Sequence, residues 1–185
     1  MRVIAGSCKG RVLFSPRGNL IRPTSDRIKE FIFDYLGQEI EKASVLDLFS
    51  GTGNLSIEAL SRGAELSFLV DKSKEAIRLI YRNLELTKLL PQCQVIHQDV
   101  FRFLKIAATN SSRFNCIFAD PPYSANIYSD LIDAIGKGDY LKDEGLFILE
   151  CDSRRFIESR DAALLMVTKK IFGDSAILVF KKEGS

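Results

Sequence analysis

The stretch VLDLFSGTGNL, residues 45–55, decides the fold of this 185-residue chain. It reads as an apolar strand, Val45–Phe49, that runs into Gly51-x-Gly53 and then into a helical pattern. Glycines at such a turn adopt backbone torsions that side chains forbid, and they let a ligand lie against bare main chain. The stretch therefore predicts the opening strand, turn and helix of a nucleotide-binding type of α/β fold.

Short apolar runs alternate with helical patterns from residue 44 onward. This alternation is typical of parallel strands joined by right-handed crossovers, and near-continuous apolar strands indicate a sheet covered on both faces. We expect strands at Val45–Phe49, Ser67–Asp71, Gln94–His97, Asn115–Ala119 and Gly145–Cys151. We expect helices at Asn54–Arg62, Ser73–Leu90, Val100–Ala108 and Asn126–Lys137.

The two ends of the chain follow other patterns. Arg2–Ala5 and Arg11–Phe14, with glycines between them, predict a short strand pair. Apolar residues at helical spacing after Thr24, the expected N-cap, predict a further helix. Leu164–Phe172 and Ser175–Lys181 flank a Gly-Asp turn and predict an antiparallel pair at the edge of the sheet.

Size and composition indicate one globular domain. Hydrophobic residues make up 46% of the chain and charged residues 27%, an ordinary balance. We expect a single domain over residues 1–185, with residues 1–20 as a basic hairpin extension and 21–185 as the core. No apolar run reaches the roughly 18 residues that a membrane span needs, and the N-terminus lacks a signal-peptide core. Four cysteines without close pairing and a single histidine predict free thiols, no metal site and a cytoplasmic protein.

Charge is distributed unevenly along the chain. Residues 1–30 contain seven basic and two acidic side chains and so carry +5, whereas the net charge of the whole chain is +2. A basic arm on a near-neutral body suggests a polyanionic partner such as RNA. A solvated basic surface with no partner explains the same pattern, because such clusters are common.

Two cofactors compete for the glycine turn. A dinucleotide usually requires a third small residue in G-x-G-x-x-G/A, and Ser56 stands there instead. S-adenosylmethionine carries a sulfonium and an ammonium group, which suit the carboxylate of Asp47 just before the glycines. Asp71 ends the next strand, 20 residues after Gly51, where a carboxylate can accept hydrogen bonds from ribose hydroxyls. The turn favours S-adenosylmethionine, although a glycine motif alone is weak support.

Asp99 follows the third expected strand. In this type of fold its position lies beside the adenine of the cofactor, whose amino group needs an acceptor. Asp99 equally suits the N-cap of the helix that follows it. The two roles are compatible, and both remain open from the sequence.

The tetrapeptide Asp120-Pro121-Pro122-Tyr123 follows the strand Asn115–Ala119 and is the most specific signal in the chain. Two prolines fix two backbone torsions and remove two N–H donors, so the carbonyls of the loop become directed acceptors. Asp120 and the Pro121 carbonyl can hold the two hydrogens of a base amino group and orient the nitrogen lone pair toward a sulfonium methyl. Tyr123 offers a face on which the base can stack. A proline-rich turn that caps the next helix is the alternative.

The chain resembles the bacterial RsmD-type guanine-N2 methyltransferases of small-subunit ribosomal RNA. The resemblance spans nearly the whole chain and is carried by MRVIAG (1–6), KGR (9–11), RPTSDR (22–27), DLFSGTG (47–53), EALSRGA (58–64) and DPPY (120–123). It implies a Rossmann-like class I methyltransferase with a mostly parallel seven-stranded sheet, helices on both faces and an N-terminal β-hairpin that helps to bind RNA. It also implies S-adenosyl-L-methionine as the cofactor and guanine N2 of 16S rRNA as the target.

The motifs assign expected roles to three groups of residues. Catalysis falls to Asp120, Pro121 and Tyr123. Cofactor binding falls to Asp47, Phe49, Ser50, Gly51, Gly53, Asp71, Lys72, Asp99 and Val100. Substrate binding falls to Arg2, Lys9, Arg11, Arg22, Thr24 and Arg27. The expected partner is ribosomal RNA or a small-subunit assembly particle, bound by a monomer without a membrane or a metal.

Three other functions remain to be weighed against this interpretation. Another amino-methyltransferase, acting on DNA adenine or on protein glutamine, shares the tetrapeptide type, but glutamine enzymes resemble the pattern with Asn in place of Asp120. A nicotinamide-dependent dehydrogenase leaves the tetrapeptide unexplained. A noncatalytic RNA-binding module disagrees with the intact glycines. The sequence does not specify which nucleotide is modified.

Overall fold

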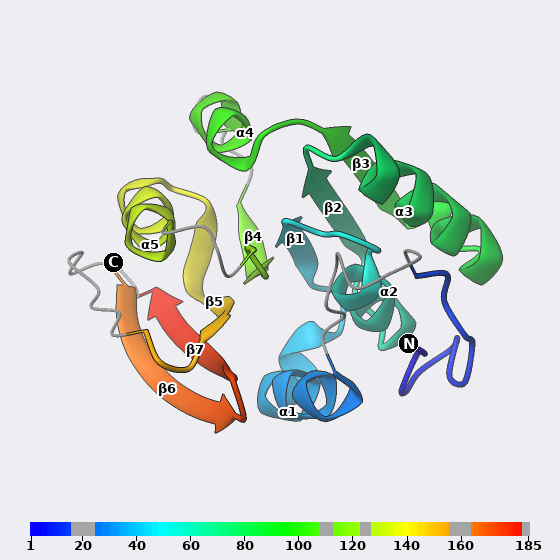
Figure 1. The fold of residues 1–185 in the computed structure, drawn as a ribbon, viewed down its shortest axis with the longest axis horizontal. Helices are drawn as coiled ribbons and strands as arrows, with labels where there is room; N and C mark the ends of the chain where they lie inside the picture. The colour runs from blue at the N-terminus through cyan, green and yellow to red at the C-terminus, as the bar shows by residue number, and fades with distance from the viewer. Residues whose placement is uncertain (16–24, 108–112, 123–126, 156–163, 183–185) are drawn as a thin grey trace.

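The computed structural model describes residues 1–15, 25–107, 113–122, 127–155 and 164–182. Its centre is one seven-stranded sheet with the strand order β3-β2-β1-β4-β5-β7-β6 (Figure 1). The strands are β1 (Ser44–Leu48), β2 (Leu66–Asp71), β3 (Cys93–His97), β4 (Phe114–Ala119), β5 (Leu141–Asp152), β6 (Leu164–Phe172) and β7 (Ser175–Lys182).

The sheet is mixed in direction. β3, β2, β1, β4 and β5 run parallel to one another, whereas β7 is antiparallel to both β5 and β6. This confirms the expected mostly parallel sheet with an antiparallel pair at one edge. The strand order reverses at β1, which lies between β2 and β4. In open α/β sheets, ligands bind outside the carboxyl ends of the strands at such a point.

Helices cover both faces of the sheet (Figure 1). The first face carries α1 (Asp26–Leu36), α2 (Asn54–Ser61) and α3 (Lys74–Thr87), and the second carries α4 (Val100–Ala107) and α5 (Tyr128–Lys137). Successive strand side chains point to opposite faces, so Val45 joins one hydrophobic core and Leu46 the other. None of these helices is long and apolar enough to cross a membrane, as far as the described ranges go.

The end of α3 differs from its prediction. The helix was expected to reach Leu90, but it ends at Thr87 because Lys88 adopts a left-handed conformation with φ 62°. A short 3₁₀ helix, η2 (Leu90–Gln92), follows and contains Pro91. Pro91 has no N–H to donate, so the α-helical hydrogen-bond pattern of α3 cannot continue through it, and the chain turns here toward β3.

The start of α1 corrects a second prediction. Ser25, not Thr24, is the N-cap, since its hydroxyl accepts from the N–H of Ile28 at 3.3 Å. Thr24 lies outside the described residues. The helix ends at Leu36, and its C-cap Gly37 is the first residue of the 3₁₀ helix η1 (Gly37–Ile40).

The N-terminal arm, residues 1–15, forms a looser hairpin than expected. Its two limbs pair through one antiparallel bridge, Arg2 with Val12, and through nearby backbone bonds such as Val3 N to Arg11 O at 3.0 Å. The expected four-residue strands do not form because the N–H groups of Ile4 and Ala5 turn to the carboxylate of Glu58, at 2.8 and 3.0 Å. The Glu58 side chain on α2 thus accepts the backbone hydrogen bonds that a partner strand would otherwise accept.

A buried polar cluster ties this arm to α1 and α2. Glu58 is fully buried and pairs with Arg62 at 2.9 Å and with Lys29 at 3.4 Å. Lys29, also fully buried, donates to the carbonyl of Arg2 and to Oδ1 of Asn54 at 3.0 Å. Burial lowers the pKa of Lys29, and the charge of Glu58 opposes that shift. The cluster therefore fixes three segments that are distant in the sequence.

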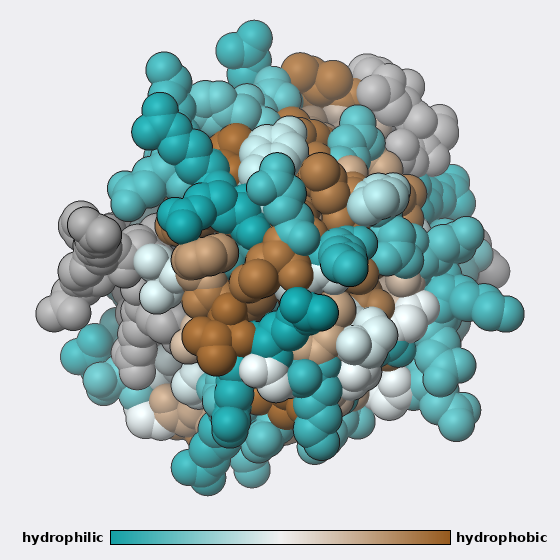
Figure 2. All heavy atoms as spheres, turned by 90° about the vertical axis from the view of Figure 1, so that its right-hand side faces the viewer, coloured by the Kyte–Doolittle hydropathy of each residue, from teal (hydrophilic) through white to brown (hydrophobic). Residues whose placement is uncertain are grey.

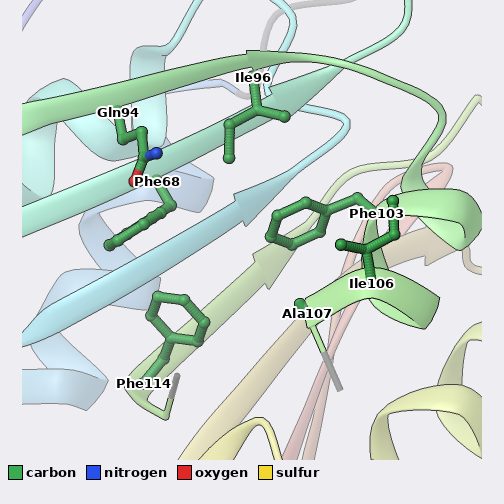
Figure 3. A pocket seen from close by; sticks show the side chains of 7 residues that line it. All are labelled: Phe68, Gln94, Ile96, Phe103, Ile106, Ala107 and Phe114. Atoms are coloured by element: carbon green, nitrogen blue, oxygen red, sulfur yellow. The ribbon is translucent and has the colours of Figure 1, made fainter. Parts of the chain in front are cut away.

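An apolar cavity of about 160 Å³ lies between α4 and the sheet (Figure 3). It is lined by Phe68, Gln94, Ile96, Phe103, Ile106, Ala107 and Phe114. The rings of Phe68 and Phe114 meet edge to face at 5.2 Å. Because Phe114 opens β4 and Gln94 lies near the start of β3, the cavity extends toward the amino ends of the strands, away from the glycine turn. It contains none of the predicted site residues.

Candidate functional site

The predicted cofactor and catalytic motifs meet at the carboxyl edge of the sheet. β1 lies between β2 and β4, with Leu48 opposite Val70 on one side and Ala119 on the other. The backbone N–H of Asp120 donates to the carbonyl of Leu48 at 3.4 Å. The glycine turn after β1 and the proline loop after β4 therefore leave neighbouring strands at the same edge.

The glycine turn is held in an uncommon backbone conformation. Phe49 has φ 59°, and Gly51 and Gly53 have φ 55° and 76°. A left-handed conformation at a residue with a side chain costs on the order of 1–3 kcal/mol and persists only where the surroundings impose it. Ser50 imposes it here, since both its N–H and its hydroxyl donate to the carbonyl of Val70, at 3.2 and 3.0 Å. The turn is thereby tied to the end of β2.

Asp47 is buried beneath the turn. Its Oδ2 accepts from the hydroxyl and from the N–H of Ser56, at 2.7 and 3.3 Å. Burial raises the pKa of Asp47 to about 7. The two hydrogen bonds from Ser56 lower this pKa, and the nearby charge of Asp71 raises it further. The carboxyl group of Asp47 thus caps the first turn of α2. Sequence reasoning missed Ser56 as its partner.

Asp71 joins the ends of β1 and β2. Its Oδ2 accepts from the N–H of Gly51 at 2.9 Å, and its Oδ1 accepts from the N–H of Ser73 at 2.8 Å. These two bonds orient the carboxylate beside the glycine turn, where ribose hydroxyls were expected. The side chain of Lys72 is exposed, and its carbonyl lies 3.0 Å from Nε2 of His97 at the end of β3.

Asp99 has the capping role that the sequence left open. Its Oδ1 accepts from the N–H of Arg102 at 3.2 Å, and this bond caps the first turn of α4. Val100, the first residue of that helix, is buried. The adenine-binding role of Asp99 stays a prediction.

The proline loop begins with Asp120, which is half-buried, and Pro121, which is buried. Tyr123 lies outside the described residues. Tyr128, the first residue of α5, packs beneath this region in the second hydrophobic core. Burial raises the pKa of Tyr128, and the charge of Asp120 contributes to the rise.

The ends of the N-terminal arm touch the glycine turn. The hydroxyl of Thr52 donates to the sulfur of Met1 at 3.5 Å. Asn83 on α3 is fully buried and donates to the carbonyl of Thr52 at 2.9 Å, and it also holds the backbone of Phe14. Sequence reasoning missed Asn83. The signal available was a polar residue on the apolar face of an amphipathic helix.

The predicted substrate-binding residues do not gather at one place. Arg2 pairs with Asp26 at 3.1 Å, at the start of α1. Arg11 donates to the carbonyl of Leu86 at 3.2 Å, at the far end of α3. Lys9 is exposed on the tip of the arm. The N–H of its neighbour Cys8 donates a hydrogen bond to the hydroxyl of Ser61, at the end of α2.

The tip of the arm is therefore distant from the glycine turn. α2 begins at that turn and has eight residues, which corresponds to about 12 Å of helix. The guanidinium of Arg27 lies 5.8 Å from the ring of Phe172 on β6, so it faces a different part of the molecule. Arg22 and Thr24 lie outside the described residues.

The turn suits S-adenosylmethionine better than a dinucleotide. A pyrophosphate needs the free N–H groups of the helix N-terminus, but the carboxyl of Asp47 already occupies the N–H of Ser56 there. The carboxylate of Asp71 beside the turn suits a ligand with a positive centre. Asn54, directly after the glycines, also keeps a buried Nδ2 without a hydrogen-bond acceptor in the described structure, and such a donor suits a carboxylate. Among the described residues, no three His, Cys, Asp or Glu side chains are arranged to hold a metal ion.

Comparison with known proteins agrees with this geometry. The model of the family described as "Conserved hypothetical protein 95" matches residues 1–181. "Putative rRNA methyltransferase YlbH" of Bacillus subtilis is 38% identical over 184 residues, which cover 100% of both chains. "Ribosomal RNA small subunit methyltransferase D" of Escherichia coli is 29% identical over 183 residues, 99% of this chain and 90% of the relative. The solved structure of "Putative methyltransferase yhhF from Escherichia coli" superposes with a TM-score of 0.88 at 29% identity and covers 100% of this chain and 99% of that one.

Proposed function

The chain belongs to the family described as Conserved hypothetical protein 95, and from this premise we propose that it methylates the N2 amino group of a guanine in small-subunit ribosomal RNA. Membership confirms the resemblance to RsmD-type enzymes, and the fold is that of class I methyltransferases. The names of its relatives support ribosomal RNA as the substrate. One observation carries the proposal: the proline loop and the glycine turn leave adjacent strands at one edge and are joined by the bond between Asp120 N and Leu48 O.

The cofactor would be held along the ends of β1, β2 and β3. Gly51 and Gly53 present bare main chain between the flanking residues Phe49 and Ser50 and α2. In this proposal Asp71 lies beside them to accept from the ribose, and Lys72, Asp99 and Val100 border the adenine. Asp47 supports the turn from below through Ser56. When bound, S-adenosylmethionine supplies a methyl group on a positively charged sulfur.

Asp120 and the carbonyl of Pro121 act on the amino nitrogen of the target base. The nitrogen lone pair is delocalised into the ring, so the nitrogen is a poor nucleophile in its planar form. Two acceptors that hold its two hydrogens favour a pyramidal nitrogen with a directed lone pair. After it has received the methyl group the nitrogen is positively charged, and it gives up one of the two held hydrogens as a proton to the carboxylate of Asp120. Tyr123 provides the stacking face.

The N-terminal arm takes part in RNA binding. Arg2 lies at the end of the arm near the glycine turn, whereas Lys9 and Arg11 lie farther away and would contact the phosphates of flanking nucleotides. In this proposal Arg22, Thr24 and Arg27 also bind the RNA, and Arg27 does so from the side of the molecule that carries Phe172 of β6. The protein acts in the cytoplasm, as a single-domain monomer over residues 1–185, on ribosomal RNA or on a small-subunit assembly particle.

Two measurements test this function. Calorimetry with S-adenosylmethionine and with NAD separates a methyltransferase from a dehydrogenase, and we expect heat only with the first. Tritium transfer from labelled cofactor to total RNA of a strain that lacks the gene, followed by nucleoside analysis, identifies the product. N2-methylguanine in small-subunit RNA supports the proposal. DNA and protein of the same strain are offered in parallel, and label in DNA adenine or in protein glutamine, with none in RNA, would overturn the proposal.

A further inference from the structure

An exposed aromatic side chain stands at the end of the N-terminal arm. Phe14 is 41% exposed, and the guanidinium carbon of Arg82 on α3 lies 4.0 Å from the centroid of its ring. None of the roles assigned above uses either residue. Figure 2 views the side of the molecule that carries α3 and the arm, and it shows apolar surface surrounded by hydrophilic side chains.

Phe14 is rigidly placed. Its N–H donates to Oδ1 of Asn83 at 2.7 Å, and its carbonyl accepts from Nδ2 of the same side chain at 3.1 Å. Asn83 is fully buried, and its Nδ2 also donates to the carbonyl of Thr52 in the glycine turn, at 2.9 Å. A single side chain therefore fixes the position of Phe14 relative to the turn where the cofactor is expected.

The mixed charges on α3 near Phe14 favour base stacking over phosphate binding as the role of this surface. Arg78 and Arg82 are exposed one turn apart on α3 and so share a face of that helix. Glu75 and Glu85 are exposed on α3 as well, so the helix is not uniformly basic and a phosphate-binding stripe is not supported. An aromatic ring with an arginine against it is the arrangement that proteins use to stack unpaired bases.

We propose that Phe14 and Arg82 form a stacking site for an unpaired RNA base that flanks the target nucleotide. The inference rests on the proposed function, since it assumes an RNA substrate at the neighbouring strand ends. The base stacks on the accessible part of the Phe14 ring, and Arg82 provides a positive planar group beside it. The stack positions the strand so that the target base reaches Asp120.

A tryptophan reporter tests the contact directly. The chain contains no tryptophan, so Phe14→Trp would introduce the sole one. We expect its emission to be quenched when small-subunit ribosomal RNA is added and to be unchanged by cofactor alone. Tyr35→Trp is the matched control, because Tyr35 is 39% exposed and lies on α1. Equal quenching of both, or quenching of neither by RNA that becomes methylated, would overturn the stacking site.

Kinetics test its contribution to substrate binding. Phe14→Leu should raise the KM for RNA about tenfold, within the roughly 5- to 150-fold that loss of one stacked base implies. The KM for S-adenosylmethionine and the kcat at saturating RNA should not change, and Phe14→Tyr should restore the wild-type KM. Arg82→Lys keeps the charge and loses the planar group, so it should raise the KM by a smaller factor. Tyr35→Leu should behave as wild type.

The outcomes separate this inference from the function on which it rests. If the wild-type protein transfers no label to RNA, the proposed function fails. If it labels RNA and Phe14→Leu leaves the KM for RNA unchanged, the stacking site alone is wrong. An equal rise in the KM for both substrates would identify Phe14 as a structural residue and would also overturn the site.

Discussion

Asp120 is the residue on which the proposed chemistry depends. Asp120→Ala removes one of two acceptors for the amino hydrogens, and we expect kcat to fall on the order of 10²–10³-fold. Cofactor affinity, measured by calorimetry, should stay close to that of the wild type because the glycine turn and Asp71 are untouched. Asp130→Ala, an exposed carboxylate on α5, is the control. Wild-type turnover in Asp120→Ala would show that another group orients the nitrogen.

Asp47 makes a pH-dependent contribution to stability. Burial raises its pKa to about 7 in the folded protein, from an ordinary value of 3.8. The folded state therefore binds the proton more tightly than the unfolded state, and stability due to Asp47 falls as pH rises from about 4 to about 7.

Asp47→Asn keeps an acceptor for Ser56 and removes the titration. The variant should gain stability relative to the wild type as pH rises through this window, at most by about 1.4 kcal/mol for each unit between the two pKa values. Urea unfolding at pH 5 and at pH 8 measures the difference. A difference between the two proteins that is independent of pH would contradict the shifted pKa.

Glu58 shows how one side chain joins several elements. It accepts from two N–H groups of the arm and pairs with Lys29 of α1 and with Arg62, the C-cap of α2. Glu58→Gln leaves the buried ammonium of Lys29 without its counter-charge, and we expect a loss of about 3–5 kcal/mol in the free energy of unfolding. Denaturant unfolding measures the loss.

Further variants serve as controls for the unfolding measurement on Glu58→Gln. Glu65→Gln changes an exposed glutamate in the turn before β2 and should leave stability nearly unchanged. The double variant Lys29→Met with Glu58→Gln removes the unpaired charge and should recover part of the loss. Lys29→Met alone completes the cycle, and if the loss in the double variant equals the sum of the losses in the two single variants, the two side chains are not coupled.

The basic arm acts at the scale of the whole molecule. Replacing Arg2, Lys9 and Arg11 together by Gln should weaken RNA binding and lower the slope of log K against log salt by about 1.4, since Lys9 and Arg11 are the proposed phosphate contacts and each single-strand contact contributes about 0.7. Replacing the exposed residues Lys105, Lys169 and Lys170, which lie on α4 and β6, gives the control with the same change in charge. Filter binding across a salt series measures both. An identical slope for the two triple variants would show that the arm makes no specific contribution to RNA binding.

Local patterns predicted most of the architecture. The strands, the helices between them and the antiparallel edge pair follow from apolar periodicity and glycine turns, which are properties of neighbouring residues. The same holds for the two loops of the candidate site, because parallel strands carry the loops that follow them to one edge of the sheet. The residues at those loops could therefore be named before their geometry was known.

The contacts that position these loops required the folded chain. Glu58 accepts hydrogen bonds from the arm in place of a partner strand, although it lies 54 residues away from Ile4. The hydroxyl of Ser56 donates to the carboxyl of Asp47 beneath the turn. Asn83 links Phe14 to Thr52 through hydrogen bonds to both backbones. Periodicity reports which face of an element is apolar, but it carries no information on which polar side chain will meet which backbone group. Such pairs are selected by the packing of distant elements, where a buried donor or acceptor must find a partner.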